Sequence, residues 1–289
     1  MSESIPERKP AWLKTTSVGN DDYLKVQKIV NGLNLHTVCK EACCPNRGEC
    51  WGAKTATFLI LGDTCTRACR FCAVNHANAK TVLPIDENEP EHIGKAVKEL
   101  GLKHAVITSV TRDDLADGGA SHYAKTVEAI HKNSPECTIE LLISDLAGSR
   151  EALAVILSAG INILNHNVET VERLYPTVRP QANYHRSLDI LRWGKELAPN
   201  IRTKSGIMVG LSETEEEVLQ VMDDLRGNNV DIMTIGQYLR PSQLQLPVVE
   251  YVTPEQFLKY RKIGLEKGFK FVESAPLVRS SYHARKHIA

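Results

Sequence analysis

Six short runs rich in β-forming residues alternate with six amphipathic helical patterns along most of this chain, and this alternation limits its fold most strongly. The expected strands begin at Thr57, His104, Thr138, Ile161, Ile201 and Asp231. The expected helices cover residues 90–100, 121–133, 149–159, 184–197, 212–228 and 254–267. The pattern predicts an α/β fold with a parallel sheet. Six units favour a partial (β/α)6 TIM-like barrel, although an open doubly wound sheet has the same periodicity.

Two of the expected helices have start signals in the sequence. Thr253 precedes Pro254, which matches an N-cap followed by a proline at the first helical position. Ser212 has Glu215 three residues further on, which matches a capping box. These signals predict where the last two helices begin.

The alternation covers only part of the chain, so we expect three regions. Residues 1–56 lack it and are expected to form an N-terminal extension. Residues 57–268 are expected to form the barrel, and residues 269–289 a C-terminal tail. A chain of 289 residues, 42% of them hydrophobic, can bury the core of one catalytic domain with such appendages.

Charge and hydropathy exclude several classes of protein. Lys and Arg total 35, as do Asp and Glu, so the zero net charge gives no support to nucleic-acid binding by a basic surface. Residues 1–14 lack the apolar core of a secretory signal, and the apolar-rich stretch at residues 152–164 is interrupted by polar residues. We expect a cytoplasmic monomer that binds neither nucleic acid nor a membrane.

Six of the eight cysteines form two groups of three within a short part of the chain. The first triplet is Cys39, Cys44 and Cys50, and the second triplet is Cys65, Cys69 and Cys72. In a reducing compartment such clusters are metal ligands more often than disulfides. Because a closed iron-sulfur cluster takes four protein ligands, each triplet predicts an iron whose fourth position is filled by something else.

The second triplet follows the first expected strand directly, in the loop at its C-terminal end. Parallel α/β barrels place their active sites at this end. A 4Fe-4S cluster held there by three thiolates would keep one iron open for the amine and carboxylate of a small molecule. The alternative is a zinc site, closed by His76 as a fourth ligand.

The segment GDTCTRACRFCAV, with Phe71 just before the last cysteine, resembles the radical S-adenosylmethionine superfamily. This resemblance implies a partial (β/α)6 barrel and a cluster whose open iron binds S-adenosylmethionine. It also implies reductive cleavage of that cofactor to a 5′-deoxyadenosyl radical, which takes hydrogen from unactivated carbon. The segment GIMVGLSE resembles the superfamily's strand-five motif, with Met208 in place of isoleucine.

The segment CKEACCPNRGECW, which contains the first triplet, resembles the lipoyl synthase family. Further matching segments are TSVTRDDLADGGA, NHNVETV, YPTVRP, GQYLRPS and RSSYHA, so the resemblance extends from the cysteine extension to the tail. Departures are small: Ala68 stands where glycine is usual, and Ser212 interrupts the common G-L-G-E sequence.

The family resemblance implies a function for both triplets and for the tail. The first triplet would bind an auxiliary 4Fe-4S cluster whose fourth ligand is Ser281, with Ser280 as the alternative. Two sulfur atoms would be inserted at C6 and C8 of an octanoyl-lysyl group, using two molecules of S-adenosylmethionine. The auxiliary cluster would be the sulfur donor and would be destroyed during turnover.

The resemblance also implies partners. The substrate carrier would be an octanoylated lipoyl carrier protein, either a dehydrogenase E2 domain or the glycine cleavage H protein. Ferredoxin or flavodoxin would supply electrons, and cluster-assembly proteins would load the iron. Two rival interpretations are another two-cluster sulfur-inserting enzyme, similar to a methylthiotransferase, and a zinc-stabilised module without catalysis.

Polar residues at or just beyond the expected strand ends are candidate cofactor contacts. Besides Phe71 and Met208, the candidates are Thr108, Ser109, Arg112, Asn165, Asn167, Glu169, Lys204 and Gln237. Arg179 and Arg240 lie in similar places, where they would steady a carboxylate or the carrier protein, or form surface salt bridges. Cys137 is expected to be a buried, small apolar residue.

Overall fold

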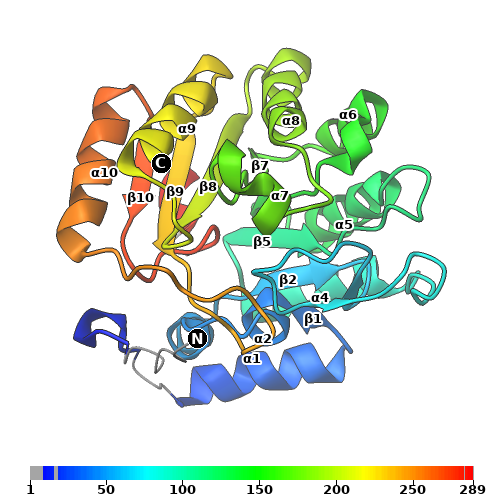
Figure 1. Ribbon diagram of the computed structural model, residues 1–289. Coiled ribbons are helices and arrows are strands. Elements are labelled where there is room, and N and C mark those ends of the chain that lie inside the picture. Colours follow the sequence, from blue (N-terminus) through cyan, green and yellow to red (C-terminus); the bar gives the residue numbers. More distant parts are fainter. Residues whose placement is uncertain (1–8, 16–18, 283, 289) are drawn as a thin grey trace.

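The computed structural model describes residues 9–15, 19–282 and 284–288, and its centre is one curved sheet with helices outside it (Figure 1). All six expected strands form. They are β2 (Thr57–Ile60), β5 (His104–Ser109), β6 (Thr138–Leu142), β7 (Ile163–Asn165), β8 (Arg202–Val209) and β9 (Ile232–Gln237). Each is hydrogen-bonded to the next in chain order, and every one of these pairs is parallel. The predicted partial barrel is therefore confirmed.

Each edge of the sheet is extended by a segment from outside the six units. The extension supplies β1 (His36–Thr37), which pairs antiparallel with β2, and the tail supplies β10 (Phe271–Ser274), which pairs parallel with β9. The strand order is β1-β2-β5-β6-β7-β8-β9-β10, and within the described residues β1 and β10 are not paired with each other. The barrel is therefore open along one side, between its first and last strands.

Six helices cover the outer face of the sheet, as the alternation predicted (Figure 1). They are α4 (Glu89–Leu100), α5 (Ala120–Asn133), α6 (Arg150–Ser158), α8 (Tyr184–Leu197), α9 (Glu215–Gly227) and α10 (Pro254–Glu266). Shorter elements are β3 (Thr64–Cys65), β4 (Asn75–His76), α7 (Tyr175–Val178) and the 3-10 turns η1 (Ala11–Leu13), η2 (Leu146–Gly148), η3 (Glu172–Leu174) and η4 (Ala284–Ile288). None of the described helices is long and apolar enough to cross a membrane.

One of the two helix-start signals was misplaced by two residues. The N-cap of α10 is Thr253, whose side chain accepts a hydrogen bond from the Gln256 N–H, as predicted. The capping box of α9, however, is formed by Thr214 and Glu217. Ser212 has a φ of 88°, which places it in the left-handed region, whereas an N-cap residue needs an extended backbone.

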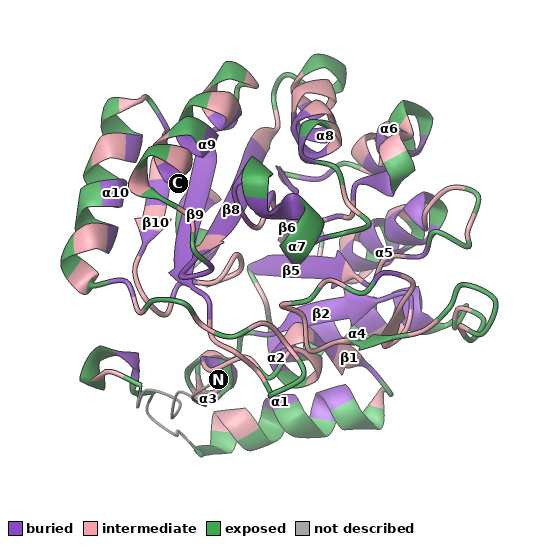
Figure 2. Cartoon of the chain, viewed as in Figure 1, coloured by how far each residue is buried: buried purple, intermediate pink, exposed green. Residues whose placement is uncertain are grey.

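The extension packs on the edge of the barrel through three helices, α1 (Asp21–Gly32), α2 (Val38–Glu41) and α3 (Arg47–Gly52). Val26 and Val30 of α1 are fully buried, and Trp51 of α3 packs against Tyr23 with ring centroids 5.2 Å apart. These side chains belong to the same hydrophobic core as Phe58 of β2. Figure 2 shows that buried residues dominate the strands, whereas the outer helices expose one face. The extension is thus fixed to the first strand of the barrel.

A buried ion pair crosses the barrel interior near the beginnings of the strands. The Lys204 Nζ lies 2.9 and 3.1 Å from the two carboxylate oxygens of Glu140, and both side chains are fully buried. Lys204 is on β8 and Glu140 is on β6, with β7 between these strands. The two side chains meet across β7 on the inner face of the sheet. Burial by itself raises the pKa of Glu140, but Lys204 and His104 outweigh burial and hold it at about 2. His287 of η4 contacts the Lys204 Nζ at 3.3 Å, so the tail covers this end of the barrel.

Removing one partner of this pair is expected to destabilise the protein strongly. Lys204→Met leaves the Glu140 carboxylate buried without its main counter-charge, which costs about 3–5 kcal/mol of unfolding free energy. The double variant Lys204→Met/Glu140→Leu removes both charges and should recover most of that loss. Urea unfolding followed by circular dichroism measures both values. A double variant as unstable as the single one would contradict this account.

Candidate active site

A cavity of about 460 Å³ inside the barrel brings residues of both triplets together. Cys65, Cys69 and Cys72 line it, and so do Cys39 and Cys44. Its other walls are the inner faces of the strands, the tail and the loop that follows β9. The two triplets were expected in separate regions of the sequence, and the structure places them around one space.

Cys50 is the one triplet member that does not line the cavity. It lies in α3, behind the other two thiols of the first triplet. Burial, together with repulsion from the neighbouring Cys39 and Cys44, raises the pKa of Cys50 to about 12. Its thiol is therefore close to the other two, although it is not on the cavity wall.

The loop that carries the second triplet is held by backbone hydrogen bonds on both sides. The N–H groups of Arg67, in the same loop, and of Thr111, in the loop after β5, donate to the Cys65 Sγ at 3.4 and 3.3 Å. The Gln245 side chain donates to the Cys72 carbonyl at 3.1 Å. N–H···S bonds of this kind favour the thiolate form that iron requires.

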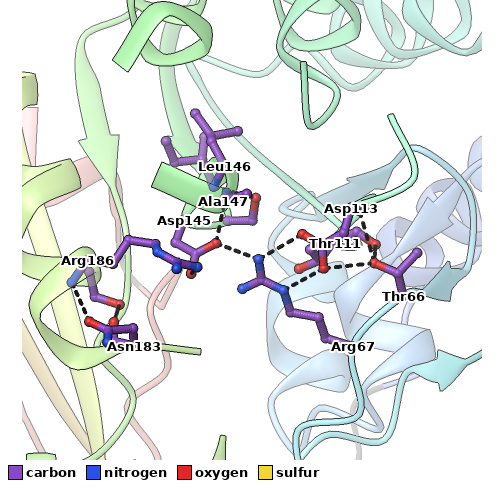
Figure 3. A network of polar contacts seen from close by, with 12 residues as sticks. Thr66, Arg67, Thr111, Asp113, Asp145, Leu146, Ala147, Asn183 and Arg186 are labelled. Carbon is purple, nitrogen blue, oxygen red and sulfur yellow. Dashed lines mark hydrogen bonds and ion pairs between the residues drawn. The ribbon is translucent and has the colours of Figure 1, made fainter. Parts of the chain in front are cut away.

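Arg67 connects this loop to the ends of two strands, as Figure 3 shows. Its guanidinium donates two hydrogen bonds to Asp113, at 2.7 and 2.8 Å, and one of 2.7 Å to Asp145. Asp145 has no exposed side-chain surface and is also paired with Arg186 at 3.5 Å. Burial alone raises the pKa of Asp145, but Arg67 outweighs burial and holds it below its usual value. The segment between Cys65 and Cys69 is therefore fixed to the loops after β5 and β6.

The tail returns to the first triplet and joins the cavity wall. The Asn46 side chain, between Cys44 and Cys50 in sequence, donates to the Leu277 carbonyl at 2.8 Å. The Thr57 Oγ1 and Ser281 Oγ atoms are 2.7 Å apart, whereas the Ser280 Oγ donates to the Asn167 Oδ1 at 2.8 Å. The two serines therefore face different walls of the cavity.

Several of the predicted cofactor contacts meet at the C-terminal ends of the strands. Those that line the cavity are Phe71, Thr108, Ser109, Asn167, Glu169 and Met208. Glu169 has a left-handed φ of 67°, and its N–H and C=O bond to Gly206 and Met208 at 2.9 Å each. The segment after β7 is thereby joined to β8, and the Glu169 carboxylate accepts a 3.1 Å bond from Asn167.

Comparison with known proteins identifies the family of this chain. The model of the radical S-adenosylmethionine superfamily matches residues 59–225, and that of the N-terminal domain of lipoyl synthase matches residues 2–44. A lipoyl synthase of Rubrobacter xylanophilus is 54% identical over 96% of this chain and 86% of its own length. The chain belongs to the lipoyl synthase family. A lipoyl synthase of Halalkalibacterium halodurans is 55% identical over 97% of this chain and 92% of its own.

Solved structures at low identity agree on the fold of this lipoyl synthase family member. The hydrogenase maturase HydG aligns with a TM-score of 0.61 at 15% identity, over 95% of this chain and 66% of its own. SuiB of Streptococcus suis, bound to S-adenosylmethionine, aligns with a TM-score of 0.57 at 11% identity, over 76% of this chain and 50% of its own. Similarity at this level supports the barrel alone.

Lipoyl synthases use S-adenosylmethionine and two 4Fe-4S clusters, and the thiols of this chain fit such clusters. All eight cysteines are free, and Cys137 is buried apart from the cavity, as expected. Burial raises the pKa of Cys39, Cys44 and Cys69, and it raises that of Cys72 to about 12. Three such thiols ionise together only when a cationic group balances them, and the iron of a cluster supplies that charge.

Four predicted cofactor contacts lie outside the cavity wall. Lys204, near the beginning of β8, and Asn165, the last residue of β7, both bind Glu140. Arg112 donates to the Leu61 carbonyl and to Asp114. Gln237 bonds to the backbone of Val209, Tyr238, Glu250 and Val252. Each of these side chains is buried and already hydrogen-bonded. The position of a residue near a strand end therefore did not predict where its side chain points.

Three arginines are more central than the sequence suggested. Arg67 and Arg279 were not singled out, and Arg179 had a surface salt bridge as its competing interpretation. The structure buries Arg179 to 9% exposure and places all three on the cavity wall. Arg240 also lines the cavity, but it braces its own loop by bonds to the Gln243 and Gln245 carbonyls. The only sequence signal for these residues was their place inside the motifs quoted above.

The Arg67 network predicts a contrast between two aspartates. Asp145→Asn removes the buried counter-charge of Arg67 and leaves only the partly exposed Asp113, so it should lower the unfolding free energy by about 3 kcal/mol, whereas Asp113→Asn should cost about 1 kcal/mol or less. The pKa of Asp145 is lowered, so its contribution is present above the unfolded pKa of about 4 and disappears as pH falls through the folded value. Urea unfolding at pH 7 compares the two variants, and a series from pH 5 down to about pH 2 follows the loss, because the folded pKa of Asp145 lies below the unfolded value. Equal losses for the two variants would contradict the assignment.

Proposed function

We propose that this lipoyl synthase family member uses its two triplets for different steps of one reaction, the insertion of sulfur at C6 and C8 of an octanoyl-lysyl group. The observation that carries the proposal is that both triplets border a single cavity. In this proposal the second triplet holds the cluster that binds S-adenosylmethionine. The first triplet holds the auxiliary cluster that donates sulfur.

The chemistry explains why two cluster sites must share one space. C6 and C8 of an octanoyl group are saturated carbons without a leaving group, so acid–base catalysis cannot replace their hydrogen atoms. When bound, the cofactors supply a radical for hydrogen abstraction and sulfide for C–S bond formation. The protein's part is to hold both groups within reach of one acyl chain and to exclude water from them.

Residues at the C-terminal ends of the strands are placed to bind S-adenosylmethionine. Cys65, Cys69 and Cys72 leave one iron position open for its amine and carboxylate. Asn167 and Glu169 offer polar groups on the adjoining wall, and Met208 offers an apolar surface for adenine. Thr108 and Ser109 lie at the end of β5, on the same cavity. Apolar side chains such as Val38, Leu59 and Leu142 also line it and suit an eight-carbon chain.

Ser281 is our choice for the fourth ligand of the auxiliary cluster. Its hydroxyl lies 2.7 Å from that of Thr57, and the Thr57 backbone is hydrogen-bonded to the Cys39 thiol. Ser280 instead faces Asn167, on the wall assigned to S-adenosylmethionine. A serine oxygen is a harder ligand than a thiolate, so iron–sulfur iron should release it more readily.

The octanoyl group is attached to a lipoyl carrier protein. We propose a dehydrogenase E2 domain or the glycine cleavage H protein as the carrier, and ferredoxin or flavodoxin as the electron donor. Cluster-assembly proteins would rebuild the auxiliary cluster. Eight free cysteines suit a reducing compartment, and we place the protein in the cytoplasm.

The direct test uses anaerobically purified protein with both clusters loaded. It is incubated with reductant, S-adenosylmethionine and an octanoyl-lysyl carrier domain, and the product is analysed by mass spectrometry. The expected product gains two sulfur atoms, and it loses two hydrogen atoms once its two thiols are oxidised to the cyclic disulfide. Absence of any sulfur-bearing product from protein that contains about eight irons would overturn the proposal.

Replacing one cysteine in either triplet is expected to abolish different steps of the reaction. Cys39→Ala removes a ligand of the auxiliary cluster, so it should spare the reductive cleavage of S-adenosylmethionine and abolish sulfur insertion. Cys65→Ala removes a ligand of the other cluster and should abolish both activities. Chromatography of 5′-deoxyadenosine and mass spectrometry of the carrier measure the two steps. Loss of cleavage in both variants would contradict the division of roles.

A further inference from the structure

Two of the arginine side chains that line the cavity, Arg179 and Arg279, each lie beside one triplet. Arg179 is buried and Arg279 is partly buried, and both face the space that the thiols border. The contacts of the two guanidinium groups are to carbonyl and hydroxyl oxygens. In the part of the chain that the structure describes, neither has a carboxylate oxygen within 4.0 Å. Both positive charges are therefore available to the groups that the thiols hold.

Backbone hydrogen bonds place Arg179 beside the second triplet. The Arg70 N–H donates to the Val178 carbonyl at 3.0 Å, and the Ala68 N–H donates to the Gln181 side chain at 2.7 Å. These two bonds flank Cys69 on one segment and Arg179 on the other. Burial raises the pKa of the Cys69 thiol, and the charge of Arg179 opposes that rise. Arg179 also donates to the Asn167 carbonyl at 3.1 Å, which fixes its direction.

The tail places Arg279 beside the first triplet. A Cβ atom at Gly236 would lie 2.1 Å from the Val278 carbonyl oxygen and 3.2 Å from the Arg279 Nη1, so glycine at this position of β9 makes room for the tail. Asn46 holds the tail from the other side through the Leu277 carbonyl. Burial raises the pKa of Cys44, and the Arg279 charge opposes that rise.

Glu169 also lines the cavity, and the charges of both arginines act on its carboxyl group. Burial raises the pKa of this carboxyl, and both Arg179 and Arg279 act in the opposite direction. The carboxylate is held by the Asn167 side chain at 3.1 Å. The Asn167 side chain also accepts a 2.8 Å hydrogen bond from Ser280, the neighbour of Arg279. A negative charge near both arginines weakens the field that each exerts at a distance.

We propose that Arg179 and Arg279 each raise the reduction potential of one cluster: Arg179 acts on the cluster of the second triplet and Arg279 on the auxiliary cluster. The inference rests on the proposed function, because it requires both clusters. Reduction adds one electron from an external low-potential donor to a cluster, without making or breaking a bond. The reduced cluster carries one more negative charge, so a nearby guanidinium stabilises it more than the oxidised form. Both arginines are positioning residues that act through charge.

The test measures the potential of each cluster separately. One set of proteins carries Cys39→Ala, Cys44→Ala and Cys50→Ala and keeps only the second-triplet cluster. The other set carries Cys65→Ala, Cys69→Ala and Cys72→Ala and keeps only the auxiliary cluster. Into each set go Arg179→Met, Arg279→Met and the control Arg173→Met, an exposed arginine paired with Glu217. Redox titration followed by electron paramagnetic resonance, without S-adenosylmethionine, gives each midpoint potential.

Each arginine variant is expected to change the midpoint potential of one cluster and not of the other. Arg179→Met should lower the midpoint potential of the second-triplet cluster and leave the auxiliary cluster unchanged, and Arg279→Met should do the reverse. Arg173→Met should change neither. Arg179→Lys and Arg279→Lys keep the charge without the planar fork, so each should shift its own cluster in the same direction by less.

Three outcomes would overturn the proposal: no shift, equal shifts of both clusters, or a shift as large in Arg173→Met. Iron and sulfide analysis precedes each titration and separates this question from the proposed function. A parent protein that binds no cluster defeats the proposed function, whereas unshifted potentials in cluster-replete variants defeat only the inference. If a methionine variant loses its cluster, the lysine variant of the same arginine takes its place. The proposal then fails if the lysine variant does not shift the midpoint potential of its own cluster.

Discussion

The six thiol groups of the two triplets line or border one cavity, and the cost of ionising thiols so close together is the constraint on which the site depends. Burial raises the pKa of each thiol for which a shift is resolved, and neighbouring thiols add repulsion, as at Cys50 and Cys72. Iron balances most of this charge when the clusters are present. Fixed groups of the protein offset the remaining negative charge of the thiolates. These groups are the N–H donors to Cys65 and the side chains of Arg179 and Arg279. The barrel supplies both kinds of group at the C-terminal ends of its strands.

The open side of the barrel is what allows the two cysteine triplets to meet around one space. A closed eight-stranded barrel fills its interior with side chains. Here β1 and β10 form the two edges of the sheet and, among the described residues, do not pair with each other, so the extension can bring the first triplet to the cavity and the tail can enter beside β9. Contacts between residues more than 200 positions apart, such as Asn46 with Leu277 and Thr57 with Ser281, close the structure around this opening. The extension and the tail therefore depend on each other.

The barrel could be predicted from the sequence because period-two strands and longer amphipathic helices alternate so regularly. The depth of a residue inside the barrel and the face to which its side chain points were harder to predict. Lys204 and Met208 share the inner face of β8, but four residues separate them by about 13 Å, which places one at the buried ion pair and the other at the cavity. Gly236 faces the tail, so Gln237 points to the opposite face and binds backbone outside the cavity. The cysteine spacing predicted the thiols, but it carried no information about which arginines would fold against them.

Arg179 and Arg279 reach the cavity for different reasons, and the difference explains why sequence position did not reveal either. Arg179 follows a short helix and is turned inward because its guanidinium donates hydrogen bonds to the carbonyls of Asn167 and Val168 after β7. Arg279 is carried in by a tail whose path is set by Gly236 and by Asn46. In both cases backbone groups fix the position of the charge. A charge held in this way does not move when a cluster changes its oxidation state, and a preorganised charge of this kind acts on a cluster more strongly than mobile solvent does.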